Sequence, residues 1–343
     1  MNNKVKIFLF ILPLLGFAIV HTKKLVYPDY FPEPVYDLKK EPLTTEKIAL
    51  GRALFYDPIL SKDGAVSCAS CHSPFSAFAH TDHALSHGIG DQIGTRNAPA
   101  LFNLAWQSSF MWDGAVNHLD VQALAPISHP KEMGESIGGV VKKLQGSQLY
   151  GRLFLTAFGD SAITGARVLK ALAQFQLTLV SANSKYDKVK QNKEQFSEQE
   201  QRGYSLFKKN CNSCHSEPMF STFGFANNGL PVDTTLNDYG RWMVTKESSD
   251  SLKFKIPSLR NLSFTYPYMH DGRFKRLRDV INHYTDGIKQ SPTLAKELRK
   301  PIVLTSDEKT DLIAFLLTLN DKDFIYNPEL QYPKEILLPT EGK

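Results

Sequence analysis

The pentapeptides Cys68-Ala69-Ser70-Cys71-His72 and Cys211-Asn212-Ser213-Cys214-His215 contain all four cysteines of the chain. Both have the C-x-x-C-H spacing, in which two thiols bond covalently to the vinyl groups of a haem and the histidine ligates its iron. The pattern therefore predicts two covalent c-type haems, one on Cys68, Cys71 and His72 and the other on Cys211, Cys214 and His215. It also predicts a fold that is organised around these two haems.

A zinc site is the alternative, because four thiolates can form a tetrahedral metal site. Two observations oppose it. A histidine follows the second cysteine in both copies, and the two cysteine pairs stand 143 residues apart, counted from Cys68 to Cys211. Haem attachment is therefore the favoured interpretation of the motifs.

The chain has 343 residues, of which 42% are hydrophobic, so it is long enough for two domains with ordinary cores. Its formal net charge of +5 includes four lysines among the first 24 residues, a stretch with no acids. The remainder carries 36 basic and 35 acidic residues and is almost neutral. This balance gives no support for a nucleic-acid partner.

Residues 1–24 have the pattern of a signal peptide or an N-terminal anchor. Lys4 and Lys6 precede the apolar run Ile7–Val20, which has 14 residues and contains Pro13. A membrane-spanning helix needs about 20 apolar residues, so a signal peptide is favoured over an anchor. We expect a periplasmic protein, because c-type haem is attached outside the bacterial cytoplasm. An uncleaved N terminus would anchor it to the membrane.

Helix signals precede both haem motifs. Thr44 or Thr45 can cap a helix ahead of the first motif, and Ser197-x-x-Glu200 is a capping box ahead of the second. Both expected helices contain the pattern G-x-x-L-F, at residues 51–55 and 203–207. The repetition indicates an internal duplication of a haem-binding helical unit. A chance likeness between two short helices is the alternative.

The rest of the chain indicates a mainly α fold. Apolar residues recur at helical spacing in two further stretches, at Val168, Leu172, Phe175 and Leu179 and, behind the capping box Thr305-x-x-Glu308, at Leu312, Leu316 and Leu319. No long alternating strand pattern is present, and much of the remainder is Gly- and Pro-rich loop. We expect two cytochrome c-like haem domains with long loops: an extended lead-in over 25–43, an N-terminal domain over 44–190 and a C-terminal domain over 191–343.

From about residue 44 to 320 the sequence resembles the bacterial dihaem cytochrome c peroxidase and MauG family. The resemblance rests on segments that follow the two motifs in order: 86–90, 94–99, 110–114, 130–134, 254–261, 265–272 and 277–287. It implies a peroxidase whose N-terminal haem reduces H2O2 to water and whose C-terminal haem delivers electrons from a small cytochrome c or a copper protein. Members of the family often form homodimers.

The resemblance implies three roles around the first haem. His87 matches the loop histidine that caps this haem at rest and must leave, and nearby glycines would let the loop move. Glu132 matches the acid above the peroxide site, which takes a proton from one peroxide oxygen and returns it to the other. Gln122 falls on a family position near the same pocket. Without the resemblance, His87 and Glu132 are ordinary solvated side chains.

Two further sets come from the same resemblance. Trp112 corresponds to the tryptophan that lies between the two haems and couples them electronically, whereas a plain core tryptophan is the alternative. Asn97, Thr265 and Pro267 match a calcium site between the domains, formed by one side-chain amide and two backbone carbonyls. That donor set contains no carboxylate, so we expect a water-rich site of modest affinity.

The second haem is where the chain departs from the typical peroxidase. Those enzymes bring a methionine to the second iron, whereas the segment that begins at Leu277 places Tyr284 there, as in MauG. The competing ligands are Met269, Met243, His283 and His270.

A MauG-like oxidase of a protein or organic substrate is therefore one alternative function, supported by Tyr284. It is opposed by Lys209, which stands where MauG has the tryptophan that passes oxidising equivalents to its substrate. A dihaem electron carrier without catalytic activity is another alternative, and it would require both irons to stay six-coordinate.

Overall fold

The computed structural model describes residues 21–338, so the predicted signal peptide or anchor lies almost entirely outside the described residues. Within the described part, no helix is long and apolar enough to cross a membrane. The fold is mainly helical, as predicted. The strands β1 (Phe225–Ala226) and β2 (Phe254–Lys255) form a short antiparallel pair.

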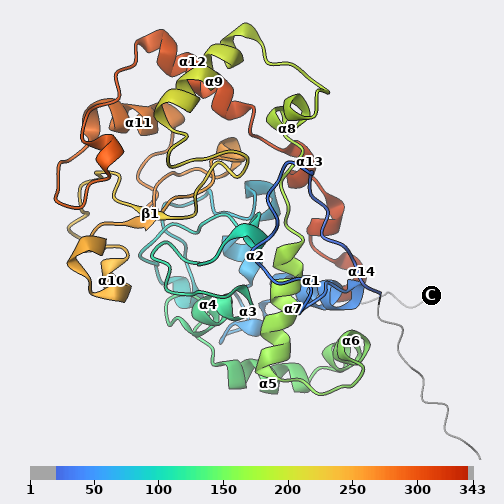
Figure 1. The fold of residues 1–343 in the computed structure, drawn as a ribbon. Helices are drawn as coiled ribbons and strands as arrows, with labels where there is room; N and C mark the ends of the chain where they lie inside the picture. The colour runs from blue at the N-terminus through green and yellow to red at the C-terminus, as the bar shows by residue number, and fades with distance from the viewer. Residues whose placement is uncertain (1–20, 339–343) are drawn as a thin grey trace, which may run out of the picture.

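The α-helices before residue 191 are α1 (Thr45–Tyr56), α2 (Cys68–Cys71), α3 (Leu119–Gln122), α4 (Leu124–Ser128), α5 (Ile137–Gln145), α6 (Gln148–Phe158), α7 (Gly165–Leu177) and α8 (Lys185–Lys190). Those after it are α9 (Glu198–Asn210), α10 (Trp242–Thr245), α11 (Leu277–Asn282), α12 (Ser306–Leu317), α13 (Lys322–Ile325) and α14 (Lys334–Leu337). Helices α1 and α3–α7 lie in one part of the molecule and α9, α11 and α12 in another, while the C-terminal α14 returns to lie beside α1 (Figure 1).

The predicted helix starts are confirmed by their capping bonds. The Thr44 side chain accepts a hydrogen bond from the backbone N–H of Lys47 at the start of α1. Ser197 and Thr305 form the expected capping boxes at α9 and α12. Each cap satisfies backbone N–H groups that have no partner inside the helix. The three helices α1, α9 and α12 therefore begin where the capping patterns of the sequence predict.

Each half is built on one close crossing of two helices, α1 with α7 and α9 with α12. A Cβ atom on Gly51 would lie 1.8 Å from the carbonyl O of Ala171, and one on Gly203 would lie 2.0 Å from the carbonyl O of Asp311. Real Cβ contacts are never this short, so only glycine allows the helix backbones to approach so closely. These are the glycines of the repeated G-x-x-L-F pattern.

A second correspondence joins the two halves. Asn103 and Asn261 have positive φ angles of 53° and 62°, which asparagine tolerates better than most residues. The N–H of Asn103 donates to the carbonyl O of Leu179 at 2.8 Å, and that of Asn261 donates to the carbonyl O of Leu319 at 3.1 Å. Leu179 follows α7 and Leu319 follows α12. The two halves therefore repeat one local construction.

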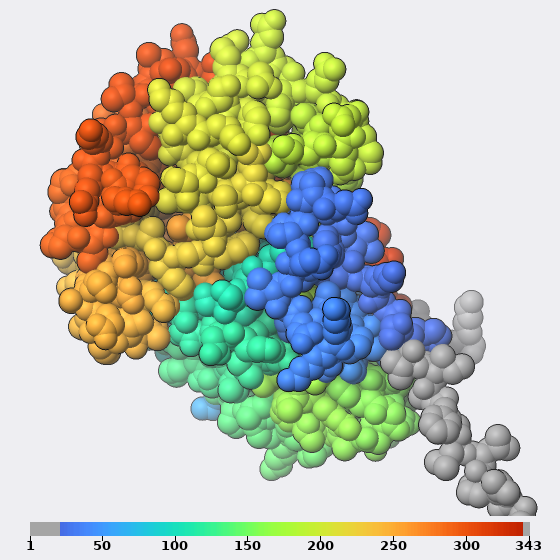
Figure 2. All heavy atoms as spheres, in the orientation of Figure 1, coloured from blue at the N-terminus to red at the C-terminus, as the bar shows by residue number. Residues whose placement is uncertain are grey.

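Segments near both ends of the described range, residues 21–338, pack against the first half. Phe31 from the lead-in and Phe324 from the C-terminal segment are buried in the same hydrophobic cluster as the α1 and α7 side chains. The Trp106 Nε1–H donates to the carbonyl O of Pro32 at 2.7 Å. Figure 2 shows the N-terminal segment, coloured blue, lying against both the first and the second half. A second, smaller core lies between α9 and α12 and includes Tyr186, Phe207, Phe220, Leu312 and Phe315.

Candidate functional site

The first haem motif presents its histidine in the form that an iron requires. Helix α2 carries Cys68 and Cys71, and His72 follows directly. The His72 Nδ1 lies 2.8 Å from the carbonyl O of Phe78, and burial lowers the pKa of His72 to about 4. The imidazole is therefore neutral and donates its Nδ1–H to Phe78. This bond fixes the tautomer and leaves the Nε2 lone pair for a metal.

The second motif repeats this arrangement. The His215 Nδ1 lies 3.2 Å from the carbonyl O of Phe220 and 3.1 Å from the carbonyl O of Pro257. Burial also lowers the pKa of His215 to about 4. Both motifs thus hold a neutral histidine by a backbone carbonyl, which is the usual way in which a protein orients a metal-ligating imidazole.

The first cavity contains the first motif and has about 550 Å³ of empty space, part of it open to solvent. Its walls bring together Cys68, Cys71 and His72 with three residues predicted for peroxide chemistry, His87, Gln122 and Glu132. The rest of the lining is largely apolar and includes Phe55, Val66, Leu101, Ala123, Pro126 and Met133. A mostly apolar pocket with a few converging polar groups fits a covalently held haem.

The second cavity contains the second motif and has about 2290 Å³ of empty space, again partly open to solvent. Its lining includes Cys211, Cys214 and His215 together with eight more of the predicted residues: Asn97, Trp112, Gln122, Thr265, Pro267, Met269, His270 and Tyr284. Because the two cysteine pairs line different cavities, they do not form one tetrahedral zinc site. In the described part of the chain, no group of three or more His, Cys, Asp or Glu side chains is placed to hold a metal ion.

Glu132 lies at the mouth of the first cavity, partly exposed. Burial raises the pKa of Glu132, and the neighbouring His129, whose Nδ1 lies 3.6 Å from Oε1, opposes that rise. A carboxyl group with a raised pKa exchanges protons closer to neutral pH than a solvated one does. The position and the chemistry of Glu132 both fit a proton shuttle in this cavity.

His87 lies on a closed loop beside Glu132. Its Nδ1 lies 2.6 Å from Oδ1 of the exposed Asp91, which leaves Nε2 for an iron, and its ring lies 4.5 Å from that of His83. The next residue, Gly88, packs tightly on the Glu132 segment. A Cβ atom on Gly88 would lie 2.1 Å from the carbonyl O of Lys131. The loop is therefore fitted closely to the acid.

Trp112 faces the second cavity and is fixed from both sides. Its Nε1–H donates to the carbonyl O of Asn97 at 2.8 Å, and its own carbonyl O accepts from the N–H of Lys255 at 2.7 Å. Gln122 is buried and lines both cavities, with its Nε2 at 3.8 Å from the sulfur of Met111. Of the four residues predicted for catalysis, Gln122 is thus the one placed at both haem sites.

Among the predicted ligands of the second iron, Tyr284, Met269 and His270 line the cavity. Tyr284 lies in a π-helical turn, His283–Gly287, directly after α11, and burial raises its pKa to about 12. The Met269 sulfur lies 3.5 Å from Nδ2 of Asn228. His283 Nε2 lies 2.9 Å from the carbonyl O of Asn228 and is engaged there.

The other two candidates are also placed differently. Met243 is exposed on α10, away from the cavity lining. His270 does line the cavity, but it stacks on Phe254 with 3.7 Å between ring centroids. Tyr284, Met269 and His270 therefore line the cavity, and of these only His270 is stacked on another ring.

The residues predicted for calcium line one cavity wall. The Asn97 Nδ2 donates to the carbonyl O of Ala84 at 3.0 Å, which leaves Oδ1 as the free end of that amide. Thr265 and Pro267 line the same cavity. Neutral oxygens of this kind suit Ca²⁺, with waters completing the shell.

Lys255 and Gln176 are polar residues of the cavities that were not predicted from the sequence. Lys255 lines the second cavity, where burial lowers its pKa to about 7 and its Nζ lies 3.2 Å from Oγ of Ser109. Gln176 lines the first cavity, and its buried Oε1 has no hydrogen-bond partner among the described residues. Lys255 lies in the segment 254–261, which carries the family resemblance, and this was a usable signal. Gln176 lies in a helix with an apolar pattern, and that pattern gives no indication that this side chain faces a cavity.

The geometry points to a class of protein: a dihaem c-type oxidoreductase with one C-x-x-C-H motif in each of two cavities, and with acid and imidazole groups gathered in the first cavity. A family model described as di-haem cytochrome c peroxidase matches residues 45–195. The methylamine utilization protein MauG of Methylorubrum extorquens is 41% identical over 84% of this chain and 82% of its own length. The cytochrome c551 peroxidase of Nitrosomonas europaea is 36% identical over 90% of this chain and 89% of its own.

Solved structures agree. A MauG-like protein associated with microbial copper homeostasis has a TM-score of 0.79 and 32% identity, covering 91% of this chain and 99% of that chain. The diheme peroxidase BthA of Burkholderia thailandensis, at 24% identity and a TM-score of 0.72, shares the fold over 82% of this chain and 87% of that chain. The chain belongs to the family of dihaem cytochrome c peroxidases and MauG proteins. It is therefore an oxidoreductase of the peroxide-acting class with two c-type haems.

Proposed function

We propose that the protein reduces H2O2 to water in the first cavity, with electrons that enter through the second haem. The observation that carries this proposal is the convergence of Glu132, His87 and Gln122 on the cavity of Cys68, Cys71 and His72. When bound, the haem iron supplies the redox centre at which peroxide accepts two electrons. The overall reaction joins H2O2 with two electrons and two protons to give two waters.

Glu132 is proposed to move the proton. Its carboxylate takes a proton from one peroxide oxygen and returns it to the other, so that the departing oxygen leaves as water and not as hydroxide. Removal of the carboxylate at comparable volume, in Glu132→Gln, is expected to lower the rate constant for peroxide reduction by roughly 10²–10⁴-fold. The matched control is Glu135→Gln on the same loop, whose carboxylate is bonded to Lys143 at 2.8 Å.

His87 is proposed to gate the cavity. Its Nδ1 bond to Asp91 orients the ring, and its place in the cavity lining would let Nε2 cap the first iron at rest. The cap must leave before peroxide enters, which requires the loop over residues 86–94 to move. Full activity of Glu132→Gln would show that another group moves the proton. Retention of the His87 cap after reduction would favour a dihaem electron carrier instead.

Trp112 and Gln122 are proposed to connect the two haem sites. Trp112 offers an aromatic ring at the second cavity, and Gln122 lines both. We propose the small cytochrome c or copper protein as the electron donor, the periplasm as the location, and calcium on Asn97, Thr265 and Pro267. A homodimer and an internal duplication are part of the same proposal, and the repeated helix crossings at Gly51 and Gly203 support the duplication.

A MauG-like reaction on a protein or organic substrate is the second candidate. One observation favours it: Tyr284, at the sequence position where typical peroxidases have a methionine, lines the cavity of the second haem. A phenolate stabilises oxidised iron, so one-electron reduction need not precede the reaction with peroxide. Lys209, exposed near the end of α9, lacks the aromatic ring that would pass an oxidising equivalent to the surface.

A further inference from the structure

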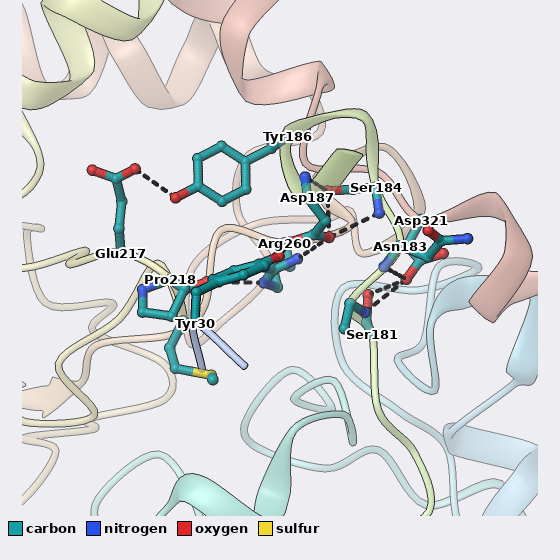
Figure 3. Close-up of polar contacts among 12 residues, drawn as sticks. Tyr30, Ser181, Asn183, Ser184, Tyr186, Asp187, Glu217, Pro218, Arg260 and Asp321 are labelled. Carbon is teal, nitrogen blue, oxygen red and sulfur yellow. Dashed lines mark hydrogen bonds and ion pairs between the residues drawn. The ribbon is translucent and has the colours of Figure 1, made fainter. Parts of the chain in front are cut away.

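A fully buried ion pair joins α8 to the loop segment 257–262. The side chains of Asp187 and Arg260 both have 0% exposure. The guanidinium binds the carboxylate through two bonds, Nη1 to Oδ2 and Nη2 to Oδ1, each 2.8 Å long (Figure 3). A paired fork of this kind gives a defined geometry, but the desolvation of two charges often cancels its gain in stability. Stability alone therefore does not account for this ion pair, and we looked for what its geometry holds in place.

Arg260 also holds the loop that orients the second haem ligand. Its Nε and Nη2 donate to the carbonyl O of Pro218 at 3.1 and 2.8 Å. The Ser258 hydroxyl donates to the next carbonyl, that of Met219, at 2.6 Å. The carbonyl after that belongs to Phe220, which shares the Nδ1–H of His215 with the carbonyl O of Pro257, the residue before Ser258. Side-chain hydrogen bonds from Arg260 and Ser258 thus fix two successive backbone carbonyls, next to the carbonyl that orients His215.

The pair is itself held from several sides. The Tyr30 hydroxyl donates to Oδ1 of Asp187 at 2.6 Å, and the backbone N–H and hydroxyl of Ser184 donate to Oδ2 at 2.8 and 2.7 Å. The guanidinium carbon lies 5.2 Å from the ring centroid of Phe31 and 5.5 Å from that of Phe220. Aromatic faces stabilise a desolvated cation at such distances. Figure 3 shows Tyr30 and Ser184 meeting at the pair.

The first half has no such charge at the corresponding position. Pro99-Ala100-Leu101-Phe102-Asn103-Leu104 and Pro257-Ser258-Leu259-Arg260-Asn261-Leu262 match in register at the two asparagines of positive φ. Phe102 therefore stands where the second half has Arg260. It is buried, and its ring lies 6.0 Å from that of Phe324. The buried Arg260–Asp187 ion pair is therefore found at the second haem site and has no counterpart at the first.

We propose that the Arg260–Asp187 pair is a positioning device for His215 and that it sets the midpoint potential of the second haem independently of the first. The proposal rests on haem at the second motif and not on where peroxide reacts. A carbonyl that accepts the Nδ1–H of a ligating histidine makes that ligand more basic, which stabilises oxidised iron. A looser Phe220 carbonyl weakens this effect, so the potential of the second haem rises.

The test is a spectroelectrochemical titration of the purified dihaem protein and its Arg260→Lys variant. Lysine keeps the positive charge but cannot form the two-bond fork or hold Pro218 at the same time. The expected result is an upward shift in the potential of the second haem with the first unchanged. The matched control is Arg202→Lys, because Arg202 on α9 pairs with Asp311 at 2.7 Å but is 59% exposed. It should shift neither haem.

An unchanged second potential in a folded Arg260→Lys protein with both haems would overturn the proposal, and so would equal shifts of both haems. Where Arg260→Lys fails to fold or to take up haem, Ser258→Ala replaces it. That variant removes the hydrogen bond from the Ser258 hydroxyl to the Met219 carbonyl. It should shift the midpoint potential of the second haem in the same direction. No shift there also overturns the proposal. Because the titration uses no peroxide, its failure is distinct from failure of the proposed peroxidase function.

Discussion

The backbone N–H of Ile89 donates to the carbonyl O of Glu132 at 2.8 Å. This bond joins the loop that carries His87, the proposed gate, to the loop that carries Glu132, the proposed proton shuttle. A movement of one loop is therefore transmitted to the other. In the proposed reaction, the loop of His87 and the loop of Glu132 therefore move together when the cavity opens.

Gly88→Ala tests this coupling. The added Cβ would lie 2.1 Å from the carbonyl O of Lys131 and 2.5 Å from that of Glu132, so the loop must lift away. We expect a larger high-spin fraction of the first haem in the oxidised protein, measured by electron paramagnetic resonance, because His87 is carried off the iron. Gly138→Ala, in α5 with no atom within 4 Å of its Cβ, is the control. A spectrum like that of the wild type would contradict the coupling.

The pH profile reports the state of Glu132. Proton transfer from peroxide needs its carboxylate, and burial raises the pKa of Glu132. The rate constant should therefore fall as pH is lowered through that pKa, at a pH above the value of about 4.3 for a solvated glutamate. Stopped-flow measurements across the acid range check this. Glu135→Gln should keep the acid limb and Glu132→Gln should lose it. If the rate constant of Glu132→Gln still fell at low pH as in the wild type, another group would be responsible for the pH dependence.

Gly51→Ala should destabilise the first half. Its Cβ would lie 1.8 Å from a backbone oxygen of α7, which cannot rotate away, so the two helices must separate. The expected loss in free energy of unfolding is about 3 kcal/mol, the upper part of the usual range for overpacking. Denaturant unfolding of the holoprotein measures it. Gly151→Ala, in α6 with nothing within 4 Å, should be neutral or slightly stabilising. Equal stability of the two variants would contradict the close crossing.

Tyr284→Met identifies the sixth ligand of the second haem. A phenolate favours oxidised iron and a thioether favours reduced iron, so the variant should have a higher potential at that haem. Met269→Leu, in the same cavity, should leave its potential and spectrum unchanged. Spectroelectrochemistry of both variants decides between the ligands. The reverse pattern, with the change in Met269→Leu alone, would assign the iron to Met269.

The elements that the sequence predicted depend on neighbours in the chain. The caps Thr44, Ser197 and Thr305 each act on a residue three positions away, so a short pattern contains the whole interaction. The attachment motifs are local in the same way. The meeting of His87 with Glu132 was predicted only through the family resemblance, because neither residue type is distinctive by itself.

What the sequence did not predict depends on contacts between distant segments. Gly51 belongs to a visible repeat, but its reason is the carbonyl O of Ala171 on another helix. Arg260 and Asp187 lie far apart in the sequence. The residues around each of them do not indicate that the other is its ion-pair partner. Such pairings become visible only when the tertiary structure brings the segments together.

The central claim is tested most directly by stopped-flow reaction of the purified dihaem protein with stoichiometric H2O2, in the fully oxidised and the one-electron-reduced forms. The account predicts a fast reaction at the first haem that requires Glu132 and is gated by His87. Fast reaction only after reduction identifies a conventional peroxidase, and fast reaction of the oxidised form identifies the MauG-like route through Tyr284. No reaction in either form would contradict the account and leave an electron carrier.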